Sequence, residues 1–160
     1  MKLKSQNIVP HLWFGKNAIE AARFYCTVFP DSEVTGTTTL KDTPGGDCDV
    51  VLFQLSGQPF MALGTNDPPA FNESVSLMIH CENQEEVDHY YDKLSADPEF
   101  EQCGWIKDKY GVTWQIATAE IRMMFETGSP EQIRSFAEAI WKMHRIDLKT
   151  LNDAFTETSK

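Results

Sequence analysis

The chain has 160 residues, of which 41% are hydrophobic and 24% are charged, values that fit one globular domain with a sizeable core. Its formal net charge of −10 argues against nucleic acid or an anionic membrane as a partner. No apolar run approaches the roughly 20 residues of a membrane-spanning helix, and the N-terminus lacks the apolar core of a signal peptide, so we expect a cytoplasmic protein.

The first element that the sequence predicts is a strand, from the apolar segment at residues 8–14. A predicted helix follows it. Asn17 is a good N-cap for that helix, Glu20 stands where a carboxylate completes a capping box, and Pro30 ends the helix. Three β-like runs follow at residues 34–40, 50–55 and 60–63, the last two joined by a tight turn at Gly57 and Gln58. Residues 7–66 therefore predict a β-α-β-β-β module.

A shift of about 66 residues superposes this module on the next part of the chain. Asn83 and Glu86 then take the places of Asn17 and Glu20, and an aromatic pair late in the first helix falls on a second aromatic pair. A strand at 75–81 precedes the second helix, and shorter β-like runs around 102–107 and 112–117 follow it. Residues 73–119 thus predict a second, compressed β-α-β-β-β module.

The character of the sequence changes beyond Ala119. Ser129 and Pro130 mark a well-formed helix start, and a second short helix begins at Asp147. These helices need an apolar surface to cover, either in this chain or in a second copy. Phe136 and Trp141 are expected to pack in the core, with a dimer contact as the alternative. We predict a single α+β domain, 1–160, with two modules, a helical extension at about 120–158, and a homodimer.

The paired modules and their helix aromatics resemble the vicinal-oxygen-chelate superfamily, which includes glyoxalase I, bleomycin-resistance proteins and extradiol dioxygenases. The PhnB-like branch is indicated by the segments at residues 10–14 (PHLWF), 21–26 (AARFYC), 29–32 (FPDS), 103–105 (CGW), 108–115 (DKYGVTWQ) and 142–147 (KMHRID). The resemblance covers nearly the whole chain. It implies the fold but leaves the activity open, because one fold hosts many chemistries.

Metal-dependent members of the superfamily hold their ion with four ligands from the two sheets. The resemblance puts those positions at Pro10, Met61, Ser76 and Gln115, of which only Gln115 offers a usable donor for iron, manganese or zinc. The four cysteines form no C-x-x-C pair that would suggest a zinc knuckle. We therefore expect no metal and no other cofactor.

Relatives of this branch are often labelled demethylubiquinone methyltransferases. A Rossmann-type methyltransferase needs a glycine-rich turn after a first parallel strand and alternating α/β units. The sequence shows neither, so it gives this label no support.

Alternation along the strands predicts which side chains face a cleft between the modules. In the later strands these are Ser76, Met78 and His80, then Thr113, Gln115 and Ala117. In the first strand, Pro10, Leu12 and Phe14 are expected to face the cleft and His11 the helix. Such a cleft is apolar with a few polar groups and suits a small ligand.

Two residues are candidates for catalysis. His80 could act as a general acid or base; the alternative is a hydrogen-bonded histidine at a strand end. Cys103 could be a nucleophile if Lys107 or Lys109 activates it; the alternative is an inert thiol. The predicted ligand-binding residues are Met61, Ser76, Met78, Trp105, Thr113 and Gln115, with Trp105 either a stacking wall for the ligand or a packing residue.

Several functions remain open at this point. One is a binder that sequesters a small molecule, as bleomycin-resistance proteins do. Another is a metal-independent lyase, isomerase or transferase acting on a small metabolite, and a metal-dependent glyoxalase-type enzyme is a further alternative. A protein whose main partner is itself is the last.

Overall fold

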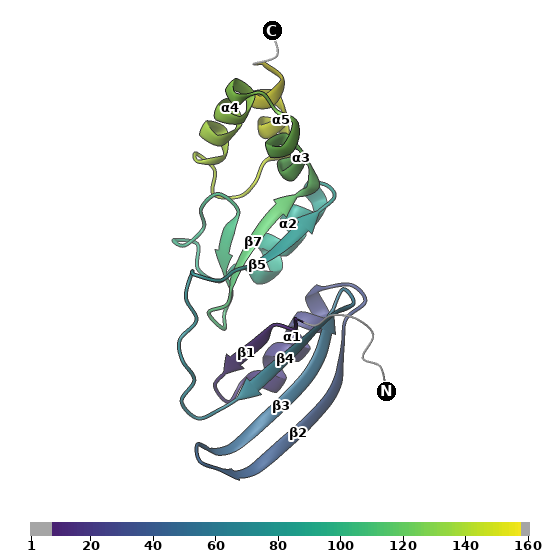
Figure 1. Ribbon diagram of the computed structural model, residues 1–160, viewed down its shortest axis with the longest axis vertical. Helices are drawn as coiled ribbons and strands as arrows, with labels where there is room; N and C mark the ends of the chain where they lie inside the picture. Colours follow the sequence, from purple (N-terminus) through teal and green to yellow (C-terminus); the bar gives the residue numbers. More distant parts are fainter. Residues whose placement is uncertain (1–7, 158–160) are drawn as a thin grey trace. The chain divides into compact units, whose positions relative to one another are not determined.

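A computed structural model describes residues 8–157 (Figure 1). Contacts within the chain divide it into two compact units, unit 1 (Met1–Ala70) and unit 2 (Phe71–Lys160). Each unit has its own sheet and its own helix packed against that sheet, so each is described by itself. Within the described residues, no helix is long and apolar enough to cross a membrane.

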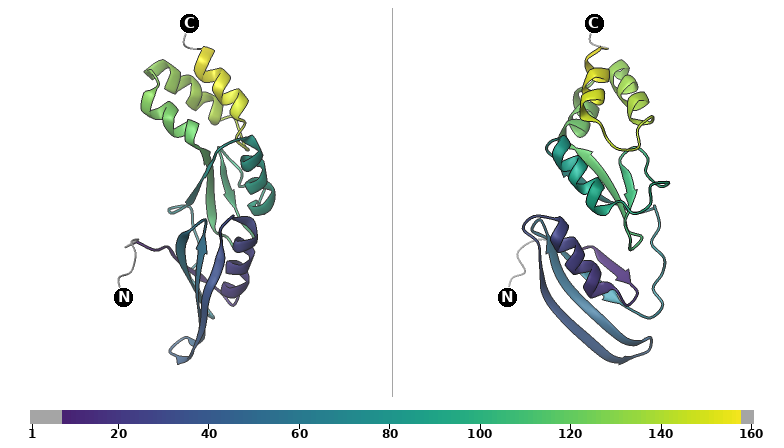
Figure 2. Two further views of the ribbon diagram at one scale, coloured as in Figure 1. Left: turned by 90° about the vertical axis from the view of Figure 1, so that its right-hand side faces the viewer. Right: turned by 180° about the vertical axis from the view of Figure 1, so that it is seen from behind.

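Unit 1 is the predicted β-α-β-β-β module. Helix α1 (Ala18–Val28) lies against a sheet of β1 (His11–Phe14), β2 (Glu33–Thr43), β3 (Gly46–Leu55) and β4 (Gln58–Gly64), as the turned views in Figure 2 show. The strand order is β1-β4-β3-β2, with β1 parallel to β4 and the other pairs antiparallel. Ser56 and Gly57 form the β3–β4 turn, both with positive φ (46° and 75°), one residue earlier than predicted.

The first strand has the opposite facing from the one predicted. Phe14 is 3% exposed and its ring centroid lies 6.4 Å from that of Tyr25 on α1, whereas Trp13 is 44% exposed. Side chains alternate along a strand, so His11 and Trp13 lie on the side opposite to Phe14. This side, away from α1, is here called the open face, and His11 pairs there with Met61 of β4. The prediction was wrong because three successive apolar residues, 12–14, leave the alternation of this short strand undecided.

The two predicted helix caps differ in the structure. Helix α1 starts directly after Asn17, but that side chain makes no capping hydrogen bond. Helix α2 (Gln84–Leu94) is capped as predicted, because the Asn83 side chain accepts from the Glu86 backbone N–H at 3.0 Å. The Glu86 carboxylate in turn accepts from the Glu82 N–H at 2.8 Å. The shared sequence pattern therefore marks both helix starts, while only the second cap forms.

Unit 2 repeats the module with one strand fewer. Its sheet contains β5 (Leu77–Cys81), β6 (Trp105–Lys107) and β7 (Thr113–Thr118) in the order β5-β7-β6, with β5 parallel to β7. Two strands follow α2 within the described residues, not the three of the predicted module. Only residues 95–112 connect α2 to β7, the strand parallel to β5, whereas residues 29–57 connect α1 to β4, the strand parallel to β1, and leave room for a hairpin.

Three helices end the described chain: α3 (Ala119–Thr127), α4 (Pro130–Ile140) and α5 (Leu148–Glu157), which gather at one end of unit 2 (Figure 1). The predicted start of α4 is confirmed as a full capping box between Ser129 and Gln132. Phe136 is fully buried, as expected, but Trp141 is 66% exposed, so its expected core packing is wrong. Trp141 lies after the last turn of α4, beyond the apolar stripe that α4 buries.

Residues 141–147, here called the strap, connect α4 to α5 and run along the loop before β6. The carbonyls of Met143 and His144 accept from the N–H groups of Cys103 (2.9 Å) and Gly104 (3.1 Å). The Tyr91 hydroxyl donates to the His144 carbonyl at 2.9 Å. The strap thereby extends the hydrogen bonding of the sheet region and ties the C-terminal helices to unit 2.

The Ser129 side chain caps α4, whereas the Asn17 side chain does not cap α1, and this difference can be tested. Ser129→Ala should lower the free energy of unfolding by about 1 kcal/mol, because it removes a side-chain acceptor from the first turn of α4. Urea unfolding followed by circular dichroism measures the loss. Asn17→Ala is the matched control, since that N-cap side chain makes no capping hydrogen bond, and it should cost clearly less. Equal losses in the two variants would contradict the assignment.

Candidate functional site

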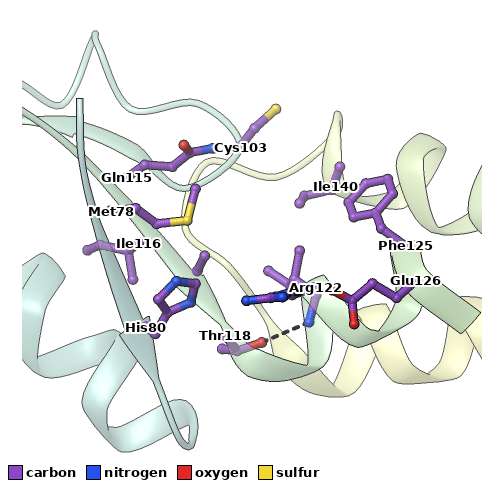
Figure 3. A pocket seen from close by; sticks show the side chains of 12 residues that line it. Met78, His80, Cys103, Gln115, Ile116, Thr118, Arg122, Phe125, Glu126 and Ile140 are labelled. Carbon is purple, nitrogen blue, oxygen red and sulfur yellow. Dashed lines mark hydrogen bonds and ion pairs between the residues drawn. The ribbon is translucent and has the colours of Figure 1, made fainter. Parts of the chain in front are cut away.

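A pocket of about 560 Å³ lies within unit 2, between its sheet and helices α3 and α4 (Figure 3). All of its lining residues belong to unit 2. The pocket borders the open face of the sheet, the face opposite to α2. From the sequence we expected a cleft between the two modules, whereas this pocket is walled by α3 and α4 of the same unit.

Four of the strand residues that line the pocket form two rows across β5 and β7. In the parallel β5–β7 pairing Met78 lies opposite Gln115 and His80 opposite Ala117, and all four line the pocket. The intervening Ile79 is only 7% exposed, whereas Met78 is 51% exposed. The predicted alternation of β5 is therefore confirmed, because Met78 and His80 face the pocket and Ile79 between them is buried on the other side of the sheet.

Helix α3 supplies the opposite wall. Thr118 caps its first turn by accepting from the Ile121 N–H at 3.4 Å. Ile121, Arg122, Phe125 and Glu126 all line the pocket, and their spacing of three and four residues puts them on one helix face. The Phe125 ring stands perpendicular to that of the buried Phe136 on α4, with 5.5 Å between centroids.

This helical wall was not predicted, because residues 119–127 were not recognised as a separate helix. Four pocket residues were therefore missed: Ile121, Arg122, Phe125 and Glu126. The signal was present, since residues 121, 124 and 125 are apolar at helical spacing and the hydroxyl of Thr118 precedes them. The short length and two charged residues made the pattern weak.

Cys103 lies at the rim of the pocket in a strained backbone conformation, with φ of +54°. Its thiol accepts from the Gln102 side-chain amide at 3.3 Å and points away from His80 in Figure 3. The predicted activating lysines have other partners. Lys107 pairs with Glu73 at 3.1 Å, and the Lys109 ammonium lies 4.9 Å from the centroid of its neighbouring tyrosine ring.

Cys81, next to His80 in sequence, lies on the other side of the sheet. It is 1% exposed, and burial, followed by the charge of Glu86, raises the pKa of its thiol to about 12. The thiol therefore stays neutral and is a packing group of the core. The two cysteines of unit 2 thus have different surroundings, one buried and one at the pocket rim.

The structure brings together four of the eight predicted site residues: Met78, His80, Cys103 and Gln115 all line the pocket. Trp105 pairs with Gln115 across β6 and β7, so it shares the same sheet face, half-buried. The other three lie elsewhere: Met61 is in unit 1, Ser76 precedes β5, and Thr113 is buried in β7. No hydrogen-bond partner for the Thr113 hydroxyl is found among the described residues. The roles of all eight stay predictions.

In each unit the strand register shows which side chains lie opposite the positions that the resemblance gives to metal ligands. Met61 pairs with His11, not Pro10, in unit 1, and Gln115 pairs with Met78, not Ser76, in unit 2. The pair in unit 1 therefore offers an imidazole and a thioether, and the pair in unit 2 offers an amide and a thioether. An imidazole suits iron or zinc, but thioethers suit copper(I) rather than iron, manganese or zinc. Among the described residues, no group of three His, Cys, Asp or Glu side chains could hold an ion.

Comparison with known proteins identifies the family. The family model described as 3-demethylubiquinone-9 3-methyltransferase matches residues 6–117. A PhnB protein from Bacillus cereus, described as a proposed methyltransferase of this name, is 32% identical over 71% of this chain and 100% of that chain, with a TM-score of 0.60. The chain belongs to the PhnB-like family. That family lies within the glyoxalase/bleomycin-resistance superfamily, as the resemblance of the motifs predicted.

More distant structures share the fold of this PhnB-like protein. A Pseudomonas aeruginosa protein is 20% identical over 71% of this chain and 98% of its own, with a TM-score of 0.51. The fosfomycin resistance protein FosX from Listeria monocytogenes is 13% identical over 78% of this chain and 100% of its own, with a TM-score of 0.53. No curated protein matches the chain. The family match ends at Ala117, before α3 begins.

Proposed function

We propose that this PhnB-like protein binds a small molecule in the pocket of unit 2. The observation that carries the proposal is the pocket itself, whose volume of about 560 Å³ lies within the range of small-molecule sites, about 300–1,000 Å³. Its lining is mainly apolar, with a few polar groups that could orient a ligand, among them His80, Gln115 and Arg122. This composition is typical of sites for ligands with an apolar body and one or two polar groups.

The proposed binding needs no resident metal ion. The thioethers of Met61 and Met78, at or opposite positions where the resemblance expects metal ligands, do not suit iron, manganese or zinc. FosX, whose structure is described with Mn(II), is only 16% identical in that form, so its metal carries no argument for this chain. A thermal-shift series with divalent ions tests this part of the proposal, and a stabilisation lost in Gln115→Ala would contradict it.

The methyltransferase activity in the family description is not part of the proposal. A Rossmann-type methyltransferase binds its cofactor at the carboxyl edge of a doubly wound parallel sheet. Within residues 8–157 the two sheets have the orders β1-β4-β3-β2 and β5-β7-β6, and each contains a single parallel pair. The described fold therefore offers no such site.

A metal-independent enzyme is the second candidate, because His80 lines the pocket on a rigid strand. An imidazole there could transfer a proton to or from a bound metabolite. His80→Ala separates the two functions once a ligand is known. A binder loses affinity alone, whereas an enzyme loses turnover, and a variant unchanged in both excludes a role for His80.

The homodimer is a further proposal, supported by large apolar side chains at the surface of the C-terminal helices. Trp141 is 66% exposed and Met123 is 54% exposed. Burying such side chains against a second copy would remove apolar surface from water. Sedimentation velocity over a range of protein concentrations tests it, and a single monomeric species throughout would exclude it.

The pocket gives the test of the proposed function. Ala117→Phe should lower the affinity of any pocket ligand at least about tenfold, because the ring fills space that the small, 7% exposed Ala117 leaves open. Ligands come from a fragment screen by ligand-observed NMR, and titrations of the backbone amides of β5, β7 and α3 locate them. Ala119→Phe is the matched control, since Ala119 is exposed and does not line the pocket. Fragments that bind both variants and the native protein equally would refute the pocket as the binding site.

A further inference from the structure

Three polar side chains of the pocket, those of His80, Arg122 and Glu126, lie on one side of it, whereas Gln115 lies beside Cys103 on the other (Figure 3). In Figure 3 the Arg122 side chain reaches from α3 toward the side of the pocket where His80 lies, with Glu126 beyond it. Arg122 is the only lysine or arginine among the lining residues. Apolar side chains, including Met78, Phe125 and Ile140, form much of the remaining wall. The pocket thus has an apolar body and an end that donates hydrogen bonds.

Arg122 already holds a carboxylate in this structure. Its Nε lies 2.7 Å from a carboxylate oxygen of Glu126, one turn along α3. Both side chains are largely exposed, at 73% and 57%, and an exposed pair of this kind contributes little to stability. The recorded contact uses only Nε of a guanidinium that carries five N–H donors. An incoming carboxylate could therefore bind Arg122 together with Glu126, or take the place of Glu126, at a small cost in free energy.

The balance of donors and acceptors favours an anionic ligand group over a cationic one. Arg122 and the imidazole N–H of His80 both donate, against the one carboxylate of Glu126, which Arg122 already neutralises. The first turn of α3, which begins after Thr118, opens on the same end and adds the positive pole of the helix. A cationic ligand would have to take Glu126 away from Arg122. The positive charge of Arg122 would then lie unpaired beside the positive charge of the ligand.

Resting on the proposed function, we infer that the pocket ligand is an amphipathic acid with a single carboxylate. The carboxylate binds Arg122 and accepts a hydrogen bond from His80, and the apolar body lies along Met78, Phe125 and Ile140. Arg122 is then the residue that determines specificity for acids. The family match ends at Ala117, so this specificity comes from a segment beyond the matched region.

A matched pair of probes tests the inference, namely octanoate and 1-octanol, which share a chain and differ in the head group. Isothermal titration calorimetry gives the affinities, and NMR titration of the pocket amides locates the binding. Native protein should bind octanoate more tightly than 1-octanol. Arg122→Met should weaken octanoate binding about tenfold or more, since a charge-assisted hydrogen bond is lost, and should change the affinity for 1-octanol much less. Arg134→Met is the control, because Arg134 makes the same i,i+4 pair with Glu138 on α4 but does not line the pocket.

Each outcome supports or overturns a defined claim. Octanoate selectivity that depends on Arg122 but not on Arg134 supports the inference. If 1-octanol perturbs the pocket amides and octanoate binds no better, the inference fails while the proposed binding pocket stands. Equal weakening in both arginine variants also overturns the role of Arg122. If neither probe perturbs pocket amides, the inference and the proposed function fail together.

Discussion

Asp108→Ala should lower the free energy of unfolding by about 3–5 kcal/mol, because it leaves buried hydrogen-bond donors without an acceptor. Asp108 is 4% exposed and stands between β6 and β7. One carboxylate oxygen accepts from the N–H groups of Tyr110 (2.9 Å) and Val112 (3.0 Å), and the other accepts from the indole N–H of Trp114 (2.7 Å). Urea unfolding followed by far-ultraviolet circular dichroism measures the loss.

Asp108→Asn divides that loss into its parts. The amide oxygen of Asn can still accept from the two backbone N–H groups, but its NH₂ group would meet the indole N–H of Trp114 as a second donor. We expect about 1–3 kcal/mol for this variant, since one buried donor loses its partner. In a Trp114→Phe background the same substitution should cost much less, because the competing donor is gone.

An exposed aspartate serves as the control for both variants. Asp153 pairs with Lys149 at 2.6 Å on α5, with side chains 55% and 85% exposed. Asp153→Asn should leave the urea midpoint nearly unchanged, because exposed pairs contribute little. A small effect of Asp108→Ala, no larger than that of Asp153→Asn, would mean that the turn relaxes and water satisfies the freed donors.

The sequence predicted the parts of the fold that repeat. The Asn and Glu pattern at the two helix starts, the aromatic pairs and the turn glycines located unit 1 and most of unit 2, because local capping and periodicity determine where such elements begin. The facing of β1 could not be predicted in this way. Leu12, Trp13 and Phe14 are all apolar, and only the packing of Phe14 on α1 decides which side is buried.

The candidate site was predicted in its strands and missed in its helix. His80 and Met78 on β5 and Gln115 on β7 alternate with residues buried on the other side of their strands, so the period of two was informative. Arg122 and Glu126 belong to a nine-residue helix, α3, whose Phe125 ring packs against Phe136 of α4. That packing joins two different helices, so the apolar spacing within α3 alone does not show that the helix forms a pocket wall.

Gly104 lies against the strap, because its N–H donates to the His144 carbonyl at 3.1 Å. Its φ is +88°, and a Cβ added there would lie 2.5 Å from the carbonyl oxygen of Ile116 and 3.2 Å from the Ile146 side chain. A contact of 2.5 Å with backbone cannot be relieved by a side-chain rotation. Gly104→Ala should therefore destabilise the protein by about 3 kcal/mol or more, as backbone strain and displacement of packed residues add up.

A second glycine separates the two causes. Gly57 has a similar φ of +75°, but nothing lies within 4 Å of an added Cβ. Gly57→Ala should cost only about 1–2 kcal/mol, the strain of a left-handed backbone alone. Urea unfolding compares the two variants, and amide hydrogen exchange at Cys103 and Gly104, which donate to the strap, should become faster in Gly104→Ala. The strap connects α4 to α5 and ties both helices to the sheet region. Equal losses of unfolding free energy in the two variants, with unchanged amide exchange, would therefore show that Gly104 does not hold these helices in place.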